Sequence, residues 1–97
     1  LQRVYGNKLK AVIVYGSVAR GTATEESDID IMVLVDGTAQ ELRTFEDQLS
    51  DVSTDISIKY FKVFSIIDIS YQEYMRWVNT SPFYRNVSKE GVILYAA

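Results

Sequence analysis

A glycine–serine pair and two aspartates are the residues of this sequence whose types and spacing best suit a chemical role. Gly16 and Ser17 follow an apolar run, and Asp28 and Asp30 begin another after ten intervening residues. Glycine permits a sharp turn and close approach of a ligand, while a serine cap leaves backbone amides free for a phosphate. Two neighbouring carboxylates repel each other unless a cation lies between them. The two pairs together indicate a site for a phosphate and a metal ion.

The expected metal is one that prefers oxygen ligands. From Asp28 to Val35 the sequence is typical of a strand, and the period of two places both aspartates on one face together with Met32. Mg²⁺ takes one or two protein carboxylates together with substrate phosphates. The chain has no cysteine and no histidine, which excludes thiolate and imidazole ligands. We therefore expect Mg²⁺, or the similar ion Mn²⁺, at Asp28 and Asp30.

The complete pattern resembles the signature of the DNA polymerase beta superfamily of nucleotidyltransferases, and in particular the minimal nucleotidyltransferase (MNT) proteins of bacteria and archaea. The match includes Tyr15, the Ala-Arg-Gly run at 19–21 and Ser27, and the segment 81–95 resembles the closing segment of MNT proteins. This resemblance implies an α/β (α+β) fold of the polymerase-beta palm type. A small mixed β-sheet flanked by helices would form a single domain over residues 1–97.

The resemblance also implies an enzyme that moves a nucleoside monophosphate, in the first place AMP from ATP, to a hydroxyl group while pyrophosphate leaves. Asp28 and Asp30 would be the catalytic and metal-binding residues, and the nucleotide would be bound by Gly16, Ser17, Arg20 and Ser27. For Arg20, a contact with the triphosphate and a plain surface position remain equally open. In MNT proteins the acceptor is often a tyrosine of a HEPN-domain toxin, so a HEPN toxin is the expected partner and an antitoxin the expected role.

The strand predicted from Lys62 to Ile69 bears on whether the site is complete. A strand, a helix and a second strand should form a parallel crossover, which places residues 62–65 level with the two aspartates. Enzymes of the superfamily carry a third carboxylate about there, but none of these four residues is acidic. Asp68 and Asp55 are the two residues that could substitute for this third acid, but Asp68 is expected to face solvent at the strand's end, and Asp55 to lie on the exposed side of a helix. The alternative function is therefore a catalytically weak or inactive module that binds nucleotide and neutralises its partner by docking.

Apolar periodicity and capping residues predict the elements that must position the site. These are a helix tail over Leu1 to Gly6, strands over Ala11 to Tyr15 and Asp28 to Val35, one long helix from Thr38 to about Tyr60, the strand over Lys62 to Ile69, a helix opened by Ser70 and Glu73, a helix from Ser81 to Gly91, and a terminal strand over Val92 to Tyr95. The first two strands should be antiparallel. The helix after Ser70 should carry Tyr74, Met75 and Val78 inward.

Composition narrows the classes of partner. The net charge is −3 and the ten basic residues are scattered, which argues against an extended nucleic-acid surface. No run approaches membrane-spanning length and no signal peptide is visible, so we expect a cytoplasmic protein with no membrane contact. The sequence starts at Leu1 rather than methionine, and we expect residues to have been trimmed before it. Phe83, Tyr84 and Arg85 are suited either to packing the last helix against the rest of the protein or to contacting another protein. The sequence does not define the oligomeric state.

Overall fold

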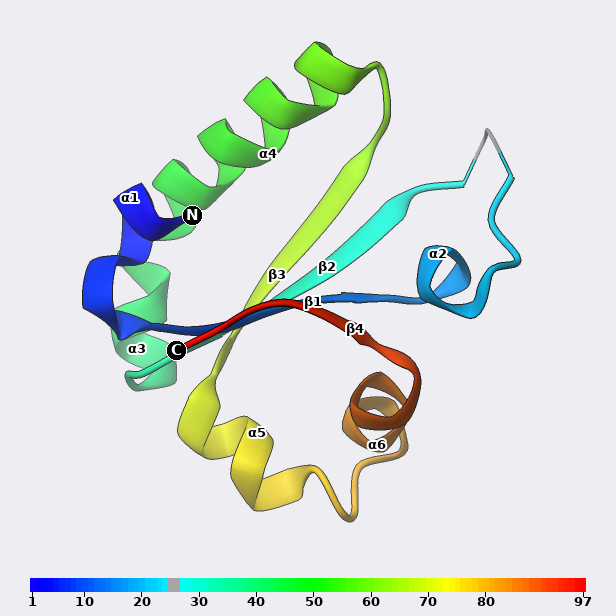
Figure 1. The fold of residues 1–97 in the computed structure, drawn as a ribbon. Coiled ribbons are helices and arrows are strands. Elements are labelled where there is room, and N and C mark those ends of the chain that lie inside the picture. The colour runs from blue at the N-terminus through cyan, green and yellow to red at the C-terminus, as the bar shows by residue number, and fades with distance from the viewer. Residues whose placement is uncertain (25–26) are drawn as a thin grey trace.

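The computed structural model describes residues 1–24 and 27–97 and has a four-stranded sheet with helices on both faces (Figure 1). In chain order the elements are α1 (Gln2–Tyr5), the 3-10 turn η1 (Gly6–Lys8), β1 (Leu9–Tyr15), α2 (Ser17–Arg20), β2 (Ile29–Val35), α3 (Ala39–Arg43), α4 (Glu46–Tyr60), β3 (Phe64–Ser70), α5 (Tyr71–Trp77), α6 (Pro82–Glu90) and β4 (Val92–Ala96). The predicted fold class, a small mixed sheet flanked by helices, is confirmed.

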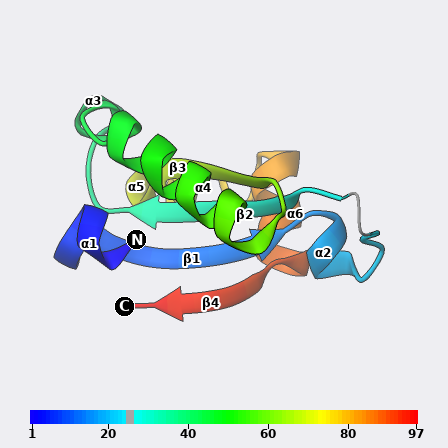
Figure 2. The ribbon, with the colours of Figure 1, turned by 90° about the horizontal axis from the view of Figure 1, so that it is seen from above.

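The sheet has the order β3-β2-β1-β4, so β3 and β4 are its edge strands (Figure 2). β1 is antiparallel to both β2 and β4, whereas β2 and β3 are parallel. The antiparallel first pair and the parallel crossover were both predicted and are confirmed. The two strands that frame the glycine–serine corner are therefore the two central strands.

Alternation along β2 divides the core between the two faces of the sheet. Ile31, Val33 and Val35 pack in a cluster with residues of α1, α3 and α4. Met32 and Leu34 pack in a second cluster with residues of α5 and α6. Figure 1 shows the same division, with α1, α3 and α4 on one face and α5 and α6 on the other. Burial on both faces explains why this central strand is almost wholly apolar after its first two residues.

The predicted long helix is two helices. Thr38 caps α3 as expected, since its side chain accepts a hydrogen bond from the Glu41 amide at 3.1 Å. The helix stops at Thr44, whose hydroxyl donates to the Glu41 carbonyl at 2.6 Å and competes with the helical hydrogen bonds. Phe45 then packs against the ring of Tyr5, with the centroids 5.0 Å apart, and α4 begins after it. The break therefore rests on a contact with α1 that local periodicity does not reveal.

The remaining helices and the last strand form largely where the sequence predicts them. Ser70 caps α5 and Ser81 caps α6, and β4 forms where the terminal strand was predicted. Tyr74 is buried and Val78 partly buried in the cluster beneath β2, as expected. Met75 was predicted to point inward, and this is wrong because its side chain is 53% exposed. No helix of the described residues is long and apolar enough to cross a membrane.

Asp68 occupies a position that the sequence did not predict. It lies within β3 rather than at a solvent-facing end, and the Tyr5 hydroxyl donates a hydrogen bond to its carboxylate at 2.9 Å. Burial, followed by the hydrogen bond and the charge of Asp68, raises the pKa of Tyr5 above its ordinary value. The expectation for Asp68 is corrected: its carboxylate joins α1 to the sheet.

We expect Tyr5→Phe to lower the free energy of unfolding by about 1–2 kcal/mol, because Asp68 loses its hydrogen-bond donor in a half-buried place. Tyr60→Phe, which alters a 58% exposed tyrosine, is the control and should leave stability unchanged. Because the pKa of Tyr5 is higher in the folded than in the unfolded protein, its hydroxyl contributes fully to the free energy of unfolding below about pH 10. This contribution falls as the pH rises further, since tyrosine in the unfolded chain ionises first. In urea unfolding, the difference in unfolding free energy between the unaltered protein and Tyr5→Phe should be smaller at pH 10.5 than at pH 7. The same difference at both pH values would contradict this account.

Candidate functional site

Gly16 forms a sharp corner between β1 and α2. Its φ of 75° and ψ of −150° are angles that residues with a side chain rarely adopt. The Arg20 amide donates to the Gly16 carbonyl at 3.1 Å, and the Thr22 amide donates to the Ser17 carbonyl at 3.0 Å. These bonds fix the short helix directly after the corner. The first amides of such a segment have no partner within the helix, which leaves them available to other acceptors.

The carboxylate of Asp30 lies directly against this corner. A Cβ atom built on Gly16 would stand 2.5 Å from the Asp30 Oδ2 atom, so any other residue at this position would force the carboxylate to move. Asp30 also pairs across the sheet with Tyr15, the residue before the corner. The structure therefore brings the glycine–serine pair and the second aspartate together, as their spacing suggested. The catalytic and binding roles of these residues stay predictions.

Tyr15 is the aromatic neighbour of Asp30. Burial and, after it, the negative charge of Asp30 raise the pKa of the Tyr15 hydroxyl. The ring stacks edge-on against Phe83 of α6, with centroids 5.5 Å apart. Tyr15 therefore remains protonated at neutral pH.

Ser27 and Asp28 lie immediately before β2. The Ile29 amide donates to the Val63 carbonyl at 2.9 Å and fixes the start of the strand beside β3. The Ser27 hydroxyl accepts a hydrogen bond from the Thr24 amide at 2.9 Å. Asp28 is exposed and lines an open cleft. The Ser27 hydroxyl thus has a partner within the protein, and its contact with a nucleotide stays a prediction.

Asp30 lies against the corner and Asp28 lies two residues before Asp30, and in the described part of the chain no third carboxylate completes a group with them. Ser65 of β3 pairs with Asp30, which is where a third acid was sought. Asp68 pairs with Val33, about 10 Å further along the strand at ~3.3 Å per residue. Asp55 is exposed on α4. Outside residues 25 and 26, no group of three or more potential ligand side chains is placed to hold a metal ion.

The donor set fits a small oxygen-preferring cation. Across residues 1–24 and 27–97, the ion pairs are Lys8 with Glu41 and Arg20 with Glu90, so neither Asp28 nor Asp30 has a basic partner. Unpaired carboxylates are the kind of ligand that Mg²⁺ or Mn²⁺ takes from a protein. Arg20 contacts Glu90 of α6 at 3.7 Å with both side chains about half exposed, a pair that contributes little to stability and leaves Arg20 open to a competing anion.

The cleft beside Asp28 was not predicted from the sequence. Its volume is about 710 Å³, and it lies where the end of α4 meets the starts of β2 and β3. Its walls are formed by Ser27, Asp28, Ser53, Thr54, Ser57, Ile58, Phe61, Lys62, Val63 and Phe64. Several of these apolar side chains are exposed, above all Phe61 at 93%. The sequence signal that could have revealed it is the apolar stretch around Phe61, which continues past the point where the helix must end.

Comparison with known proteins gives one family over nearly the whole chain. The family described as "Polymerase beta, Nucleotidyltransferase" matches residues 2–97. A protein of Methanocaldococcus jannaschii named "Putative protein adenylyltransferase" is 38% identical over 95 residues, which are 98% of this chain and 87% of that protein. A second protein of the same organism and description is 44% identical over 57 residues, covering 54% of this chain and 58% of its own length.

Two solved structures share the fold. One is a crystal structure of a toxin–antitoxin with AMP-PNP, with a TM-score of 0.62, 20% identity, and coverage of 99% of this chain and 68% of that chain. The other is a mutant of the toxin–antitoxin MntA-HpeT, with a TM-score of 0.61, 18% identity and the same coverage. At this level of identity the likeness concerns the fold alone.

Proposed function

The chain belongs to the polymerase beta nucleotidyltransferase family, and we propose that it is an adenylyltransferase that moves AMP from ATP to a hydroxyl group of a partner protein. The observation that carries the proposal is the contact between Gly16 and the carboxylate of Asp30, because it joins a phosphate-suited corner to an acidic pair without a protein cation. The 38% identity to a protein named as an adenylyltransferase favours AMP over other nucleotides.

Each residue of the site has a distinct role in this proposal. The corner at Gly16 and Ser17 binds the β- and γ-phosphates, with Ser27 and Arg20 as further contacts of the nucleotide. Asp28 and Asp30 hold Mg²⁺ or Mn²⁺. The divalent cation, when bound, neutralises negative charge on the triphosphate. Arg20 reaches the nucleotide by exchanging its exposed pairing with Glu90 for a phosphate.

The proposed reaction is a single in-line displacement. The acceptor oxygen forms a bond to the α-phosphorus, the bond from this phosphorus to the bridging oxygen breaks, and pyrophosphate leaves with the electron pair. The acceptor proton passes to solvent, since the described residues offer no third carboxylate beside the pair. A phenolic hydroxyl suits such a site because its pKa of about 10 is low for an alcohol.

A tyrosine of a HEPN toxin is the acceptor that we propose, and the chain would then act as an antitoxin. The fold neighbours are toxin–antitoxin complexes, which favours a toxin as the partner. The HEPN class comes from the resemblance of the glycine–serine and aspartate pattern to MNT proteins. The partner gene should encode a small helical protein with an Arg…His ribonuclease motif beside the gene for this chain.

The second candidate is a module that binds nucleotide and neutralises its toxin by docking. Ser65 favours this reading, because it stands beside Asp30 where a third acid would strengthen the site. A docking module would still inhibit and bind its partner when the two aspartates are replaced. The two candidates therefore differ in whether inhibition depends on the acidic pair.

Calorimetry tests the shared basis of both candidates. We expect ATP to bind with a 1:1 stoichiometry in the presence of Mg²⁺ and to bind much more weakly when EDTA removes the ion, because the acidic pair then repels the triphosphate. Addition of the neighbouring gene's product and α-labelled ATP should transfer the label to that protein. Absence of ATP binding in Mg²⁺ and in Mn²⁺ would refute the proposed nucleotide site.

A further inference from the structure

The helix α6 lies on the sheet face that carries the Asp30 carboxylate. Alternation along β2 places Asp30 on the same face as Met32, which packs with residues of α5 and α6. Tyr15, which pairs with Asp30 across the sheet, packs against the same cluster. Figures 1 and 2 show α6 and α2 next to each other at this end of the sheet. α6 therefore borders the glycine corner on the face where the carboxylate lies.

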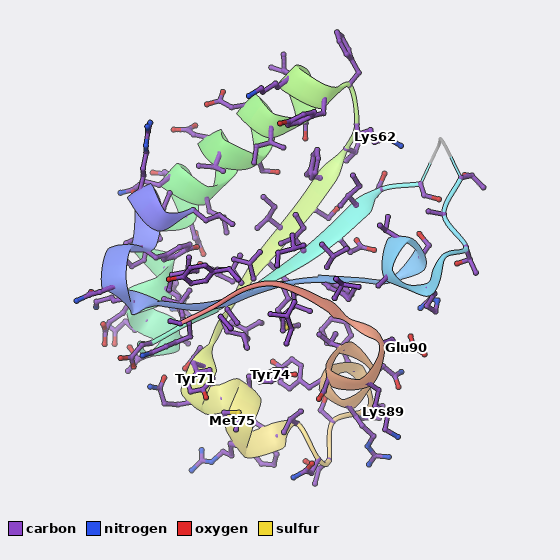
Figure 3. The ribbon with its side chains drawn as sticks, viewed as in Figure 1. Lys62, Tyr71, Tyr74, Met75, Lys89 and Glu90 are labelled. Carbon is purple, nitrogen blue, oxygen red and sulfur yellow. The ribbon has the colours of Figure 1, made fainter. Side chains whose placement is uncertain are left out.

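One side of α6 faces this corner. The Phe83 ring packs edge-on against the Tyr15 ring, and the Glu90 carboxylate contacts Arg20 of α2 at 3.7 Å. Figure 3 shows Glu90 on the side of α6 towards α2. Phe83, Asn86 and Glu90 follow each other at intervals of three and four residues, which places them along one side of a helix. The exposed Asn86 therefore lies between two residues that both make contacts at the corner.

Packing on its other side holds α6 in this position. Val87 is buried in the cluster beneath β2. At the end of the helix, a Cβ atom built on Gly91 would stand 2.5 Å from the Cγ2 atom of Ile13, so α6 lies close against β1. The Phe83 ring is nevertheless 45% exposed. A well-packed helix thus presents a flat aromatic surface beside the corner.

The chemistry of this side of α6 suits a purine base, and adenine in particular. Bases stack on aromatic rings, because every base has a flat π face. The side-chain amide of Asn86 has one donor and one acceptor, which match the N7 acceptor and the N6 amino donor of adenine. Guanine presents two acceptors on the same edge, so it can use only the donor of the amide. A stacking ring and an amide on one side of a helix therefore favour adenine over guanine.

We infer that Phe83 and Asn86 form the adenine subsite for ATP, in which the ring stacks on the base and the amide hydrogen-bonds to its N6 and N7 atoms. The inference rests on the proposed function, in which the corner binds the phosphates, and it names the residues that select the nucleotide. The cleft beside Asp28 is less suited to the base, because it is walled by α4 on the opposite face of the sheet.

Calorimetry with ATP, GTP and inorganic tripolyphosphate, each with Mg²⁺, separates the base from the phosphates. Tripolyphosphate has no base, so its affinity reports on the corner and the cation alone. Phe83→Leu keeps an apolar side chain against Tyr15 but lacks a flat ring, Phe83→Trp restores a ring, and Asn86→Ala removes the amide. The matched controls are Trp77→Leu, which alters an aromatic residue of similar exposure on α5, and Asn79→Ala, which removes another exposed amide.

We expect Phe83→Leu to weaken ATP binding about tenfold, as for loss of base stacking, and to leave tripolyphosphate binding within about twofold. Phe83→Trp should bind ATP at least as tightly as the unaltered protein. Asn86→Ala should weaken ATP binding more than GTP binding, so that the preference for ATP falls. Both controls should match the unaltered protein with all three ligands. In NMR titrations, ATP but not tripolyphosphate should shift the amide signals of residues 83–86.

Three results would overturn the inference while leaving the proposed function in place. An unchanged ATP affinity in Phe83→Leu would show that the ring does not stack on the base, and a raised KM for the acceptor protein in that variant would then assign the ring to the acceptor. An equal loss of tripolyphosphate affinity would show that the variant disturbs the corner. Tripolyphosphate that binds the unaltered protein as tightly as ATP would show that the base has no subsite. If neither ligand binds, the proposed nucleotide site is itself refuted, and the inference with it.

Discussion

Replacement of both Asp28 and Asp30 by asparagine is expected to lower Mg²⁺-dependent AMP transfer by roughly a thousandfold or more. Asparagine preserves the shape of each side chain but removes the charge that holds the cation and so leaves the triphosphate unneutralised. The fold should not suffer, because neither carboxylate has a basic partner in the described residues. The measurement is transfer of label from α-labelled ATP to the partner protein, with thermal unfolding alongside.

The matched control is the double variant Asp51→Asn with Asp55→Asn. Both of these residues are exposed on α4, so the variant removes the same two charges from elsewhere on the surface. It should transfer AMP at the rate of the unaltered protein, which would also exclude Asp55 as a substitute third acid. Labelling that persists in the Asp28 and Asp30 double variant would contradict the proposed roles. Persisting inhibition of the partner without labelling would support the docking module instead.

Gly16→Ala should reduce transfer by about a hundredfold while costing only about 1–2 kcal/mol of unfolding free energy. The new methyl group would stand 2.5 Å from Asp30 Oδ2, so the carboxylate must move away from its position beside the corner. A displacement of about 1 Å in a reacting geometry is enough for a loss of this size. The stability cost comes mainly from the φ of 75° and ψ of −150°, because the end of an aspartate side chain can yield more easily than backbone.

Gly21→Ala tests the effect of backbone strain in α2 without a clash between the new methyl group and Asp30. Gly21 has nearly the same φ, 74°, but a methyl group there would meet nothing within 4 Å. Gly21 has a left-handed ψ of 18°, which side chains tolerate better than the ψ of −150° at Gly16, so we expect Gly21→Ala to lose less stability in urea unfolding and only Gly16→Ala to lose activity. A similar fall in activity in both variants would show that the rigidity of the α2 turn, rather than the position of Asp30, controls transfer.

The parts of the fold that the sequence predicted are those that local rules determine. A strand that ends at a glycine and a strand that begins with alternating aspartates must meet at a corner, and the crossover rule then orients β3. Serine caps marked the starts of α5 and α6, and both helices begin there. For these reasons the sequence alone could predict that Gly16 and Asp30 lie close together. Their chemical roles stay predictions.

The parts that were missed depend on contacts between distant segments. The break between α3 and α4 depends on the contact of the Phe45 ring with the Tyr5 ring. The hydroxyl of the same tyrosine donates a hydrogen bond to the Asp68 carboxylate. The cleft depends on where α4 ends, and the end at Phe61 is a left-handed cap that occurs without the usual glycine. Periodicity shows which face of a helix is apolar, but it does not show which other segment that face will meet.

The pairing of β4 with β1 has a consequence for how the protein is made. β1 carries the glycine corner, and one of its two edges is covered only when residues 92–96 pair with Ala11 to Val14. Contacts of such high sequence separation form late and slow the search for the native state. A chain still on the ribosome that ends before Val92 presents Val12, Ile13 and Val14 as an uncovered, aggregation-prone edge. Until the five residues of β4 pair with β1, this edge of the sheet is therefore open to pairing with another chain.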